Sequence, residues 1–327
     1  MLTQMFEILG PIVIITAIGY LLGRSSVGLD TRALSSMVLL VATPALIFHT
    51  LTSLHVTPDT IRTMAGAALM CITLTGVMGL AILLSVGGPV RSFLPPLMLP
   101  NSGNMGLPLV LLAFGTEGLQ LGVAYFFVVA LVQHSVGLSI YAGSLRLSAI
   151  LKQPLIYAVA AVLLVTWTGL PVPEIVLVTT ELLGGMMVPA MLMLLGASLA
   201  SLQVTDLRPA LLVAFARLSL GVISALTVIF LLGLEGITAG VVFLLATMPT
   251  AIVNYIYAER FQHNPRQVAG SIVTSTIVTF VCLPMLVWTA LGISESDDES
   301  ARHSVLPVTS ERQGVALEAS WQIDKDR

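Results

Sequence analysis

The chain has 327 residues, of which 56% are hydrophobic and only 9% are charged. Soluble domains carry about a quarter of charged residues, so this composition excludes a water-soluble fold. The formal net charge is -3, and the basic residues are scattered singly, which excludes the basic surface that nucleic-acid binding requires. An all-α membrane protein, embedded in a lipid bilayer, is therefore expected.

Apolar runs that are long enough to cross a bilayer follow one another along the chain. A hydrocarbon core of about 30 Å needs roughly 20 apolar residues per helix. Ten such runs are separated by glycine, proline and charged residues: 4–23, 33–52, 61–86, 92–114, 118–143, 149–169, 175–200, 207–233, 236–258 and 266–291. Because the connections are too short for a folded extramembrane domain, any function is expected to lie within the membrane.

The basic residues predict the orientation, because Lys and Arg stay on the cytoplasmic side during insertion. Eight of them fall in the first, third, fifth, seventh and ninth connections: Arg24, Arg32, Arg91, Arg146, Lys152, Arg208, Arg260 and Arg266. The opposite connections hold Arg62 alone, beside several acidic residues. Both termini are therefore expected to lie outside.

Prolines recur at corresponding places in the two halves of the chain. Those of runs 1, 2 and 4 have counterparts in runs 6, 7 and 9: Pro11 and Pro154, Pro44 and Pro189, Pro100 and Pro249. Since each half has five runs, an odd number, the second half must enter the membrane upside down. The sequence thus predicts two inverted five-helix repeats, residues 1–146 and 147–292. The polar residues 293–327 are expected to form a disordered tail.

The fourth run is interrupted by the sequence PNSGNMGLP, residues 100–108. Proline removes a backbone donor and glycine weakens a helix, so the segment cannot be a regular α-helix. Freed peptide groups at this depth cannot face lipid and must line an enclosed cavity. There the amino end of a half-helix, with Pro100, Asn101, Gly103 and Asn104, would offer donors to an anion, and a carboxylate is the natural ligand.

The ninth run carries a milder interruption at Pro249, followed by Thr250 and Asn254. Interrupted helices at corresponding places in inverted repeats are the usual pointer to a transporter's binding site. If the two interruptions cross at the pseudo-twofold axis, Asn101, Thr250 and Asn254 converge on one small volume, together with Asn104. The alternative is that each run is a kinked structural helix.

Arg217 lies deep in the eighth run, where a charge is costly and usually faces a cavity or a partner. One interpretation is a counter-charge for an anionic substrate or a gate residue. The other is an arginine that snorkels or hydrogen-bonds helix ends.

Other polar residues in the runs have a functional and a structural interpretation. Gln133 and His134 lie in the fifth run, where the imidazole, which titrates near neutral pH, could carry a coupling proton or be a satisfied core residue. Ser271 and Ser275 are four residues apart on the tenth run and share one face. They either line the pathway or bond to the carbonyls of their own helix.

The first run also contains a GxxxG sequence formed by Gly19 and Gly23. Small residues at this spacing let two membrane helices approach closely. A close helix contact is one interpretation of this pair.

The chain resembles the auxin efflux carrier family, which includes plant PIN-formed auxin carriers and bacterial malonate-transporter-like proteins. The motifs that carry the resemblance are PNSGNMGLP at 100–108, PALIF at 44–48, MVPAMLMLLGASLA at 187–200 and TMPTAIVNYIYAERF at 247–261. The resemblance implies crossed broken helices, transport of small organic acids, a homodimer and an elevator-like motion. By motif, Pro100, Asn101 and Pro249 match the crossing, and Asn101 is the amide that meets the substrate carboxylate. Asn254 stands where plant carriers have a second proline, which puts auxin itself in doubt as the substrate.

The sequence therefore predicts a secondary transporter of a small organic anion, with elevator-type alternating access, in the inner membrane of a bacterium. A membrane sensor that binds a ligand without translocating it is the alternative. An intramembrane enzyme would need an HExxH or GxSxG motif or paired mid-span aspartates, and the sequence contains none. Neither a cofactor nor a metal is expected, and the expected partners are the anion, the bilayer and a second copy of the chain.

Overall fold

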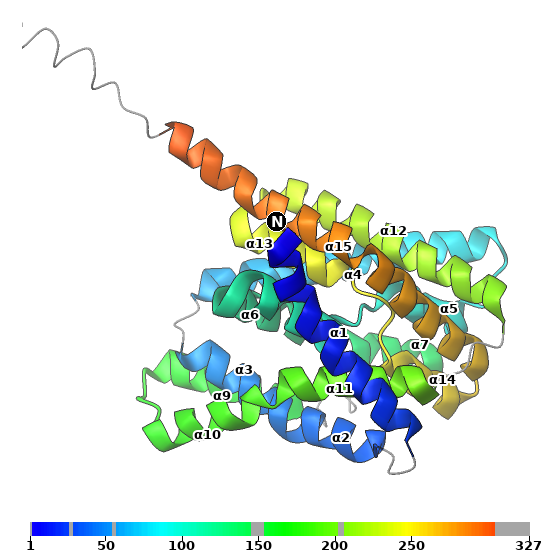
Figure 1. The fold of residues 1–327 in the computed structure, drawn as a ribbon, viewed down its shortest axis with the longest axis horizontal. Coiled ribbons are helices and arrows are strands. Elements are labelled where there is room, and N and C mark those ends of the chain that lie inside the picture. Colours follow the sequence, from blue (N-terminus) through cyan, green and yellow to red (C-terminus); the bar gives the residue numbers. More distant parts are fainter. Residues whose placement is uncertain (1, 26–28, 54–56, 145–153, 202–205, 305–327) are drawn as a thin grey trace, which may run out of the picture.

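The structure is a computed structural model, and it describes residues 2–25, 29–53, 57–144, 154–201 and 206–304. Every named element in these ranges is a helix (Figure 1). Three short segments, labelled η, are π-helical. In chain order the elements are α1 (Leu2–Arg24), α2 (Thr31–Met37), η1 (Val38–Ala42), α3 (Thr43–Ser53), α4 (Pro58–Ser85), α5 (Val90–Met98), η2 (Ser102–Gly106), α6 (Leu107–Val132), η3 (Gln133–Gly137), α7 (Leu138–Ala142), α9 (Pro154–Thr168), α10 (Glu174–Gly185), α11 (Met187–Ser201), α12 (Leu207–Leu232), α13 (Gly236–Ala246), α14 (Val253–Phe261) and α15 (Pro265–Ser304).

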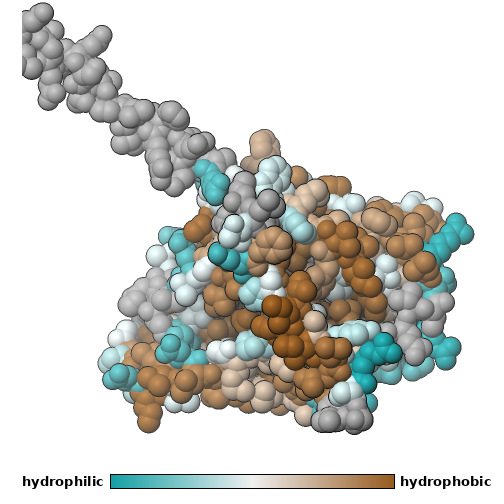
Figure 2. Space-filling view, viewed as in Figure 1, coloured by the Kyte–Doolittle hydropathy of each residue, from teal (hydrophilic) through white to brown (hydrophobic). Residues whose placement is uncertain are grey.

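Seven helical stretches of the described chain are long and apolar enough to cross a membrane. Large apolar side chains on their outer faces are open to the surroundings, among them Phe6, Phe230 and Val281, which are 76%, 84% and 76% exposed. Figure 2 shows a broad hydrophobic surface over α1 in the middle of the view, with hydrophilic residues mainly toward the left and right edges. Exposure of so large an apolar surface to water would be unfavourable. The long apolar helices that form it identify an integral membrane protein.

The helices form two groups (Figure 1). The first bundle consists of α1, α2, η1, α3, α9, α10 and α11, in which α1 packs along α11 and α3 contacts both α9 and α10. The second bundle consists of α4 to α7 and α12 to α15, in which α4 contacts α6 and α12, and α15 contacts α12 and α13. The two bundles touch where α1, α3 and α11 meet α6 and η2.

Glycines bring α1 and α11 into backbone contact. A Cβ atom on Gly19 would overlap the backbone of Met193, and one on Gly23 would lie 2.9 Å from the Cα atom of Ala197. Gly196 of α11 lies equally close to the backbone of α1. The structure thus confirms that the GxxxG sequence of the first run serves a close helix contact.

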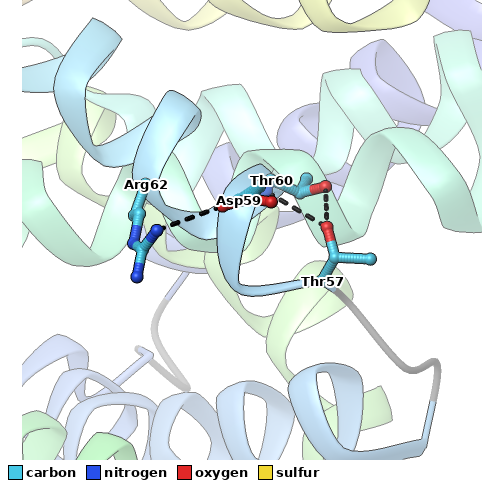
Figure 3. A network of polar contacts seen from close by, with 4 residues as sticks. All are labelled: Thr57, Asp59, Thr60 and Arg62. Carbon is cyan, nitrogen blue, oxygen red and sulfur yellow. Dashed lines mark hydrogen bonds and ion pairs between the residues drawn. The ribbon is translucent and has the colours of Figure 1, made fainter.

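The amino end of α4 illustrates how local sequence fixes a helix start (Figure 3). The Thr57 hydroxyl accepts a hydrogen bond from the Thr60 N–H at 3.2 Å, and Pro58 takes the first helical position. Asp59 in the first turn favours the positive helix end and pairs with Arg62 at 3.2 Å. This exposed pair is the only ion pair formed by the described part of the chain.

The helix α6 folds back on itself at Gly115, whose φ of 65° and ψ of -155° are not helical. Gly122 packs against the side chains of Leu107 and Val110, which a straight helix of about 1.5 Å per residue would place more than 15 Å away. The stretch Ser102–Ala142 is therefore a helical hairpin, with its turn between the fourth and fifth apolar runs. A glycine is needed there because L side chains rarely adopt positive φ.

The carboxyl end of the chain differs from the sequence expectation. The helix α15 continues to Ser304, so residues 293–304 are helical, and the prediction of a disordered tail from residue 293 is wrong for this segment. Residues 305–327 lie outside the described ranges. Arg146 and Lys152, which contributed to the predicted orientation, lie outside them as well.

Candidate binding site at the crossing of two broken helices

Two helices of the second bundle are interrupted near their middles. The helix α5 ends at Met98, and helical structure resumes with η2 at Ser102. Likewise α13 ends at Ala246 and α14 begins at Val253. Leu99 is extended, with φ of -104° and ψ of 106°, because the following proline excludes helical geometry at the preceding residue.

The two interruptions lie side by side and hydrogen-bond to each other. The Asn101 N–H donates to the Pro249 carbonyl at 2.7 Å, and the Ala251 N–H donates to the Leu99 carbonyl at 3.2 Å. These bonds form an antiparallel bridge in which Pro100 lies opposite Thr250. In the sequence, the two halves align with Pro100 paired to Pro249. The pairing in the bridge therefore differs from that sequence alignment by one residue.

Hydroxyl groups satisfy the peptide groups that the prolines release. Pro100 has no N–H, so the carbonyl of Pro96, four residues earlier, loses its helical donor. The Thr250 hydroxyl takes that place at 2.9 Å. The Thr250 N–H donates in turn to the Ser275 hydroxyl at 3.2 Å. Thr250 and Ser275 thus hold the crossing together, and neither lines the cavity beside it.

Arg217 of α12 lies behind the crossing, with its side chain 1% exposed. Its guanidinium donates to the Leu97 carbonyl at 3.2 Å and to the Ala246 carbonyl at 2.5 Å. These carbonyls belong to the carboxyl ends of α5 and α13. Arg217 is absent from the cavity lining, so the structure matches the interpretation in which the arginine bonds helix ends rather than a substrate.

A cavity of about 710 Å³ lies between the two bundles, beside the crossing. The second bundle contributes the following lining residues: Pro100, Asn101, Ser102, Gly103, Asn104, Phe126, Ala130, Gln133, His134, Ala251, Ile252, Val253, Tyr255, Ile256 and Glu259. The first bundle contributes Thr31, Arg32, Ser35, Ser36, Val38, Leu39, Thr43, Pro154, Met191, Leu194, Ser198 and Ser201. A ligand in this cavity would therefore contact both bundles.

Three buried polar groups in the described lining of the cavity have no hydrogen-bond partner. The Asn101 Nδ2, the Ser102 Oγ and the Thr43 Oγ1 are buried and have no hydrogen-bond partner among the described residues. Their residues are 5%, 0% and 2% exposed, and all three line the cavity. Buried polar groups without partners call for an explanation, and each of these can donate to an anion.

The helix that begins at Ser102 adds its amino end to this site. The first N–H groups of a helix have no intrahelical acceptor, and the helix dipole places about half a positive charge there. Gly103 lets this turn pack closely against Phe126, because a Cβ atom on residue 103 would lie 2.8 Å from the Phe126 ring. The helix end thus favours an anion at the inner end of the cavity, where the described lining residues include no basic side chain.

All three π-helical segments line the cavity: η1 through Val38 and Leu39, η2 through Ser102 to Asn104, and η3 through Gln133 and His134. Short π-helical segments occur frequently at functional sites. Apolar periodicity does not distinguish a π-turn from an α-turn, so the sequence indicates neither η1 nor this geometry in η3.

His134 connects the cavity wall to α14. Its Nδ1 lies 2.6 Å from the Tyr257 hydroxyl, and the two rings meet edge to face.

Other candidate residues from the sequence lie outside the cavity. The Ser271 hydroxyl donates to the carbonyl of Gln267 in its own helix. Asn254 is fully buried, with neither amide atom partnered, and does not line the cavity. The sequence predicts that Asn254 and Asn101 lie at one site, but only Asn101 lines the cavity.

The outer end of the cavity is lined by Thr31 and Arg32 at the start of α2, Ser201 at the end of α11, and Glu259 near the end of α14. These helix ends adjoin the first, seventh and ninth connections. The cavity therefore extends from the crossing toward the side of the molecule that carries the predicted cytoplasmic connections. Glu259 accepts a hydrogen bond from Tyr255 at 3.0 Å, and Arg32 and Glu259 are both exposed.

Within the described ranges, no group of three or more His, Cys, Asp or Glu residues could hold a metal ion. Apolar helices, two of them broken and crossed beside a cavity, define the chain as a membrane-embedded protein. Residues 142–289 match the family described as membrane transport protein, which covers auxin efflux carriers and related transporters rather than enzymes. Over these residues the match agrees with the family resemblance of the sequence, and it indicates a membrane transporter. A comparison with curated proteins found no match to the chain.

Proposed function

We propose that this protein is a secondary transporter that carries a small organic anion, bound by its carboxylate at the crossing of the two broken helices. The observation that carries the proposal is the set of unpartnered donors from Asn101, Ser102 and Thr43 at the inner end of the cavity. A carboxylate accepts several hydrogen bonds at once and would satisfy these donors. Among the described lining residues, no carboxylate side chain competes for these donors, because the one acidic residue there, Glu259, lies at the outer end of the cavity.

The proposed architecture is ten membrane helices in two inverted repeats. The helix contacts support it, because exchanging the halves maps the α1–α11 contact onto α9–α3, α4–α6 onto α12–α15, and α4–α5 onto α12–α13. Seven stretches pass the length and hydropathy test for a span, and three further crossings are proposed. One is the second arm of the hairpin at Gly115, one is α9, and one is the broken pair of α13 and α14.

The transport step is proposed to be an elevator-type movement. The cavity lies between the bundles, while both broken helices belong to the second bundle. A bound anion would thus move with the second bundle past the first. The proposed assembly is a homodimer in the inner membrane of a bacterium, with both termini outside.

Labelling tests the orientation and the direction in which the cavity opens. Ser35→Cys and Ser201→Cys, both in the cavity lining, should react with a membrane-impermeant thiol reagent in inside-out vesicles and not in right-side-out cells. Thr57→Cys, at the opposite end of the protein, should show the reverse pattern. The background protein replaces Cys71 and Cys282 with serine. Labelling of both groups of sites from one side would refute the proposed topology.

Tracer flux tests the transport function. Proteoliposomes that contain the purified protein should accumulate radiolabelled malonate or indole-3-acetate, whereas empty liposomes should not. A sensor would bind the same compound, as a rise in thermal stability would show, without accumulation. Binding without flux would therefore favour the sensor and refute the transporter.

A further inference from the structure

A buried positive charge lies behind the proposed anion site without a carboxylate beside it. Arg217 is 1% exposed, and the ion pairs of the described residues do not include it. An isolated cation in the membrane interior is costly, so it usually pairs with an acid or contacts backbone carbonyls. Arg217 takes the second course, with hydrogen bonds to Leu97 and Ala246.

The two carbonyls lie at the same distance in sequence from the prolines that interrupt their helices. Each lies three residues before the proline of its interruption, Pro100 or Pro249. In an unbroken helix, the N–H groups of Asn101 and Thr250 would bond these carbonyls. The crossing diverts those N–H groups to Pro249 and to Ser275. The geometry that forms the site therefore also leaves the carbonyls of Leu97 and Ala246 without their helical donors.

The charge of Arg217 matches that of the two helix ends. Each carboxyl end of a helix carries about half a negative charge, so the ends of α5 and α13 together carry about one. A single guanidinium, with several donors in a rigid fork, can offset both ends at once. In other transporters, half-helix carboxyl ends and unwound carbonyls coordinate a bound cation instead.

The geometry points to Arg217 as a positioning residue: a built-in cation that joins the carboxyl ends of both half-helices and holds the crossing in its anion-binding form. This inference rests on the proposed function and adds the element that stabilises the site from behind. Arg217 does not contact the ligand. Without Arg217, the negative charge of the two helix ends would face the donors of the anion site without being offset. The two ends would then separate.

The neighbouring helix turn is built for this arrangement. Gly221 lies four residues after Arg217 on α12, on the same face. A Cβ atom on it would lie 2.6 Å from the Ala246 carbonyl oxygen, so any other residue would push the end of α13 away. The glycine thus lets α13 come close enough for Arg217 to bond Ala246.

The test measures the kinetics of malonate and indole-3-acetate uptake in proteoliposomes. Arg217→Met keeps an apolar side chain of similar length but removes the charge, and we expect KM to rise roughly tenfold or more. Arg217→Lys keeps the charge but cannot bond both carbonyls with a planar fork, so a smaller rise is expected. Guanidinium ion should restore part of the uptake by Arg217→Ala, because it can occupy the vacated place between the two carbonyls.

Thr75→Val is the matched control. The Thr75 hydroxyl donates to the Met98 carbonyl at 3.3 Å, next to the Leu97 carbonyl, and carries no charge. Its loss should leave KM close to the wild-type value. A similar rise in KM for Thr75→Val and Arg217→Met would overturn the proposal, because any missing cap would then explain the effect.

Two further results would overturn it: a wild-type KM in folded Arg217→Met, or folded Arg217→Ala that guanidinium does not improve. If these variants do not fold, Gly221→Ala decides, since it keeps Arg217 and displaces the Ala246 carbonyl. A raised KM would then support the proposal, and an unchanged KM would overturn it. Wild-type protein that accumulates neither probe would refute the proposed function and with it this inference.

Discussion

Replacing Asn101 by alanine separates ligand binding from folding. The Asn101 Nδ2 has no partner in the unliganded protein, so its removal costs no hydrogen bond on folding. The free energy of unfolding should therefore stay within about 1 kcal/mol of the wild-type value. A hydrogen bond to a charged carboxylate contributes about 1.5–3 kcal/mol, which corresponds to a loss of affinity of roughly 10- to 150-fold. Affinity should thus fall while stability does not.

The assay compares ligand-induced thermal shifts with direct binding of the carboxylate that the tracer-flux test identifies as a substrate. Asn254→Ala is the matched control, because this asparagine is also buried and unpartnered but lies outside the cavity lining. It should bind the carboxylate as the wild type does. Asn101→Asp should bind still more weakly than Asn101→Ala, since it adds a like charge. Wild-type affinity in Asn101→Ala, or an equal loss in Asn254→Ala, would refute the reasoning.

Other contacts predict measurable effects. Thr250→Val removes the hydroxyl that caps the Pro96 carbonyl of α5 and should lower the free energy of unfolding by about 1–3 kcal/mol. Thr250→Ser keeps a hydroxyl and should retain most of the wild-type stability. Thermal unfolding measures both effects. Gly196→Ala forces a methyl group into the backbone of α1 and should cost about 1–3 kcal/mol, while Gly10→Ala, with open space around it, should be tolerated. His134→Ala and Tyr257→Phe break the same bond, so their effects on substrate affinity should be non-additive in a double-mutant cycle, and additive effects would contradict a positioning role for that bond.

Much of the helix layout was predictable from the sequence, because apolar length and proline act locally. The expected run 61–86 corresponds to Pro58–Ser85, and the run 207–233 to Leu207–Leu232. The helix breaks fall at the prolines of the fourth and ninth runs for the same reason. Residues 293–304 are the exception: their polar composition predicts disorder, yet they continue an apolar helix.

The site itself depends on contacts between distant parts of the chain, which local patterns do not encode. Which face of a broken helix lines a cavity follows from rotation about its axis, and the sequence did not separate Asn101 from Asn254 on this point. The partners of Arg217 were equally hidden, since Leu97 and Ala246 are ordinary apolar residues whose carbonyls become acceptors only at the crossing. The sequence could place a charge at this depth but could not say what it bonds.

In the proposed inverted-repeat fold, the bridge at the crossing also explains how two similar halves can have different roles. In the antiparallel bridge, Pro100 lies opposite Thr250. A twofold rotation that exchanges these two residues also exchanges Asn101 with Ala251. An amide thus faces the cavity in the first half, where the second half has only a methyl group. The second half supplies the Thr250 hydroxyl, which caps the end of α5 and so fixes the segment that carries Asn101. A symmetric fold of the proposed kind can therefore hold one asymmetric site, because one interruption would present the donors and the other would keep them in place.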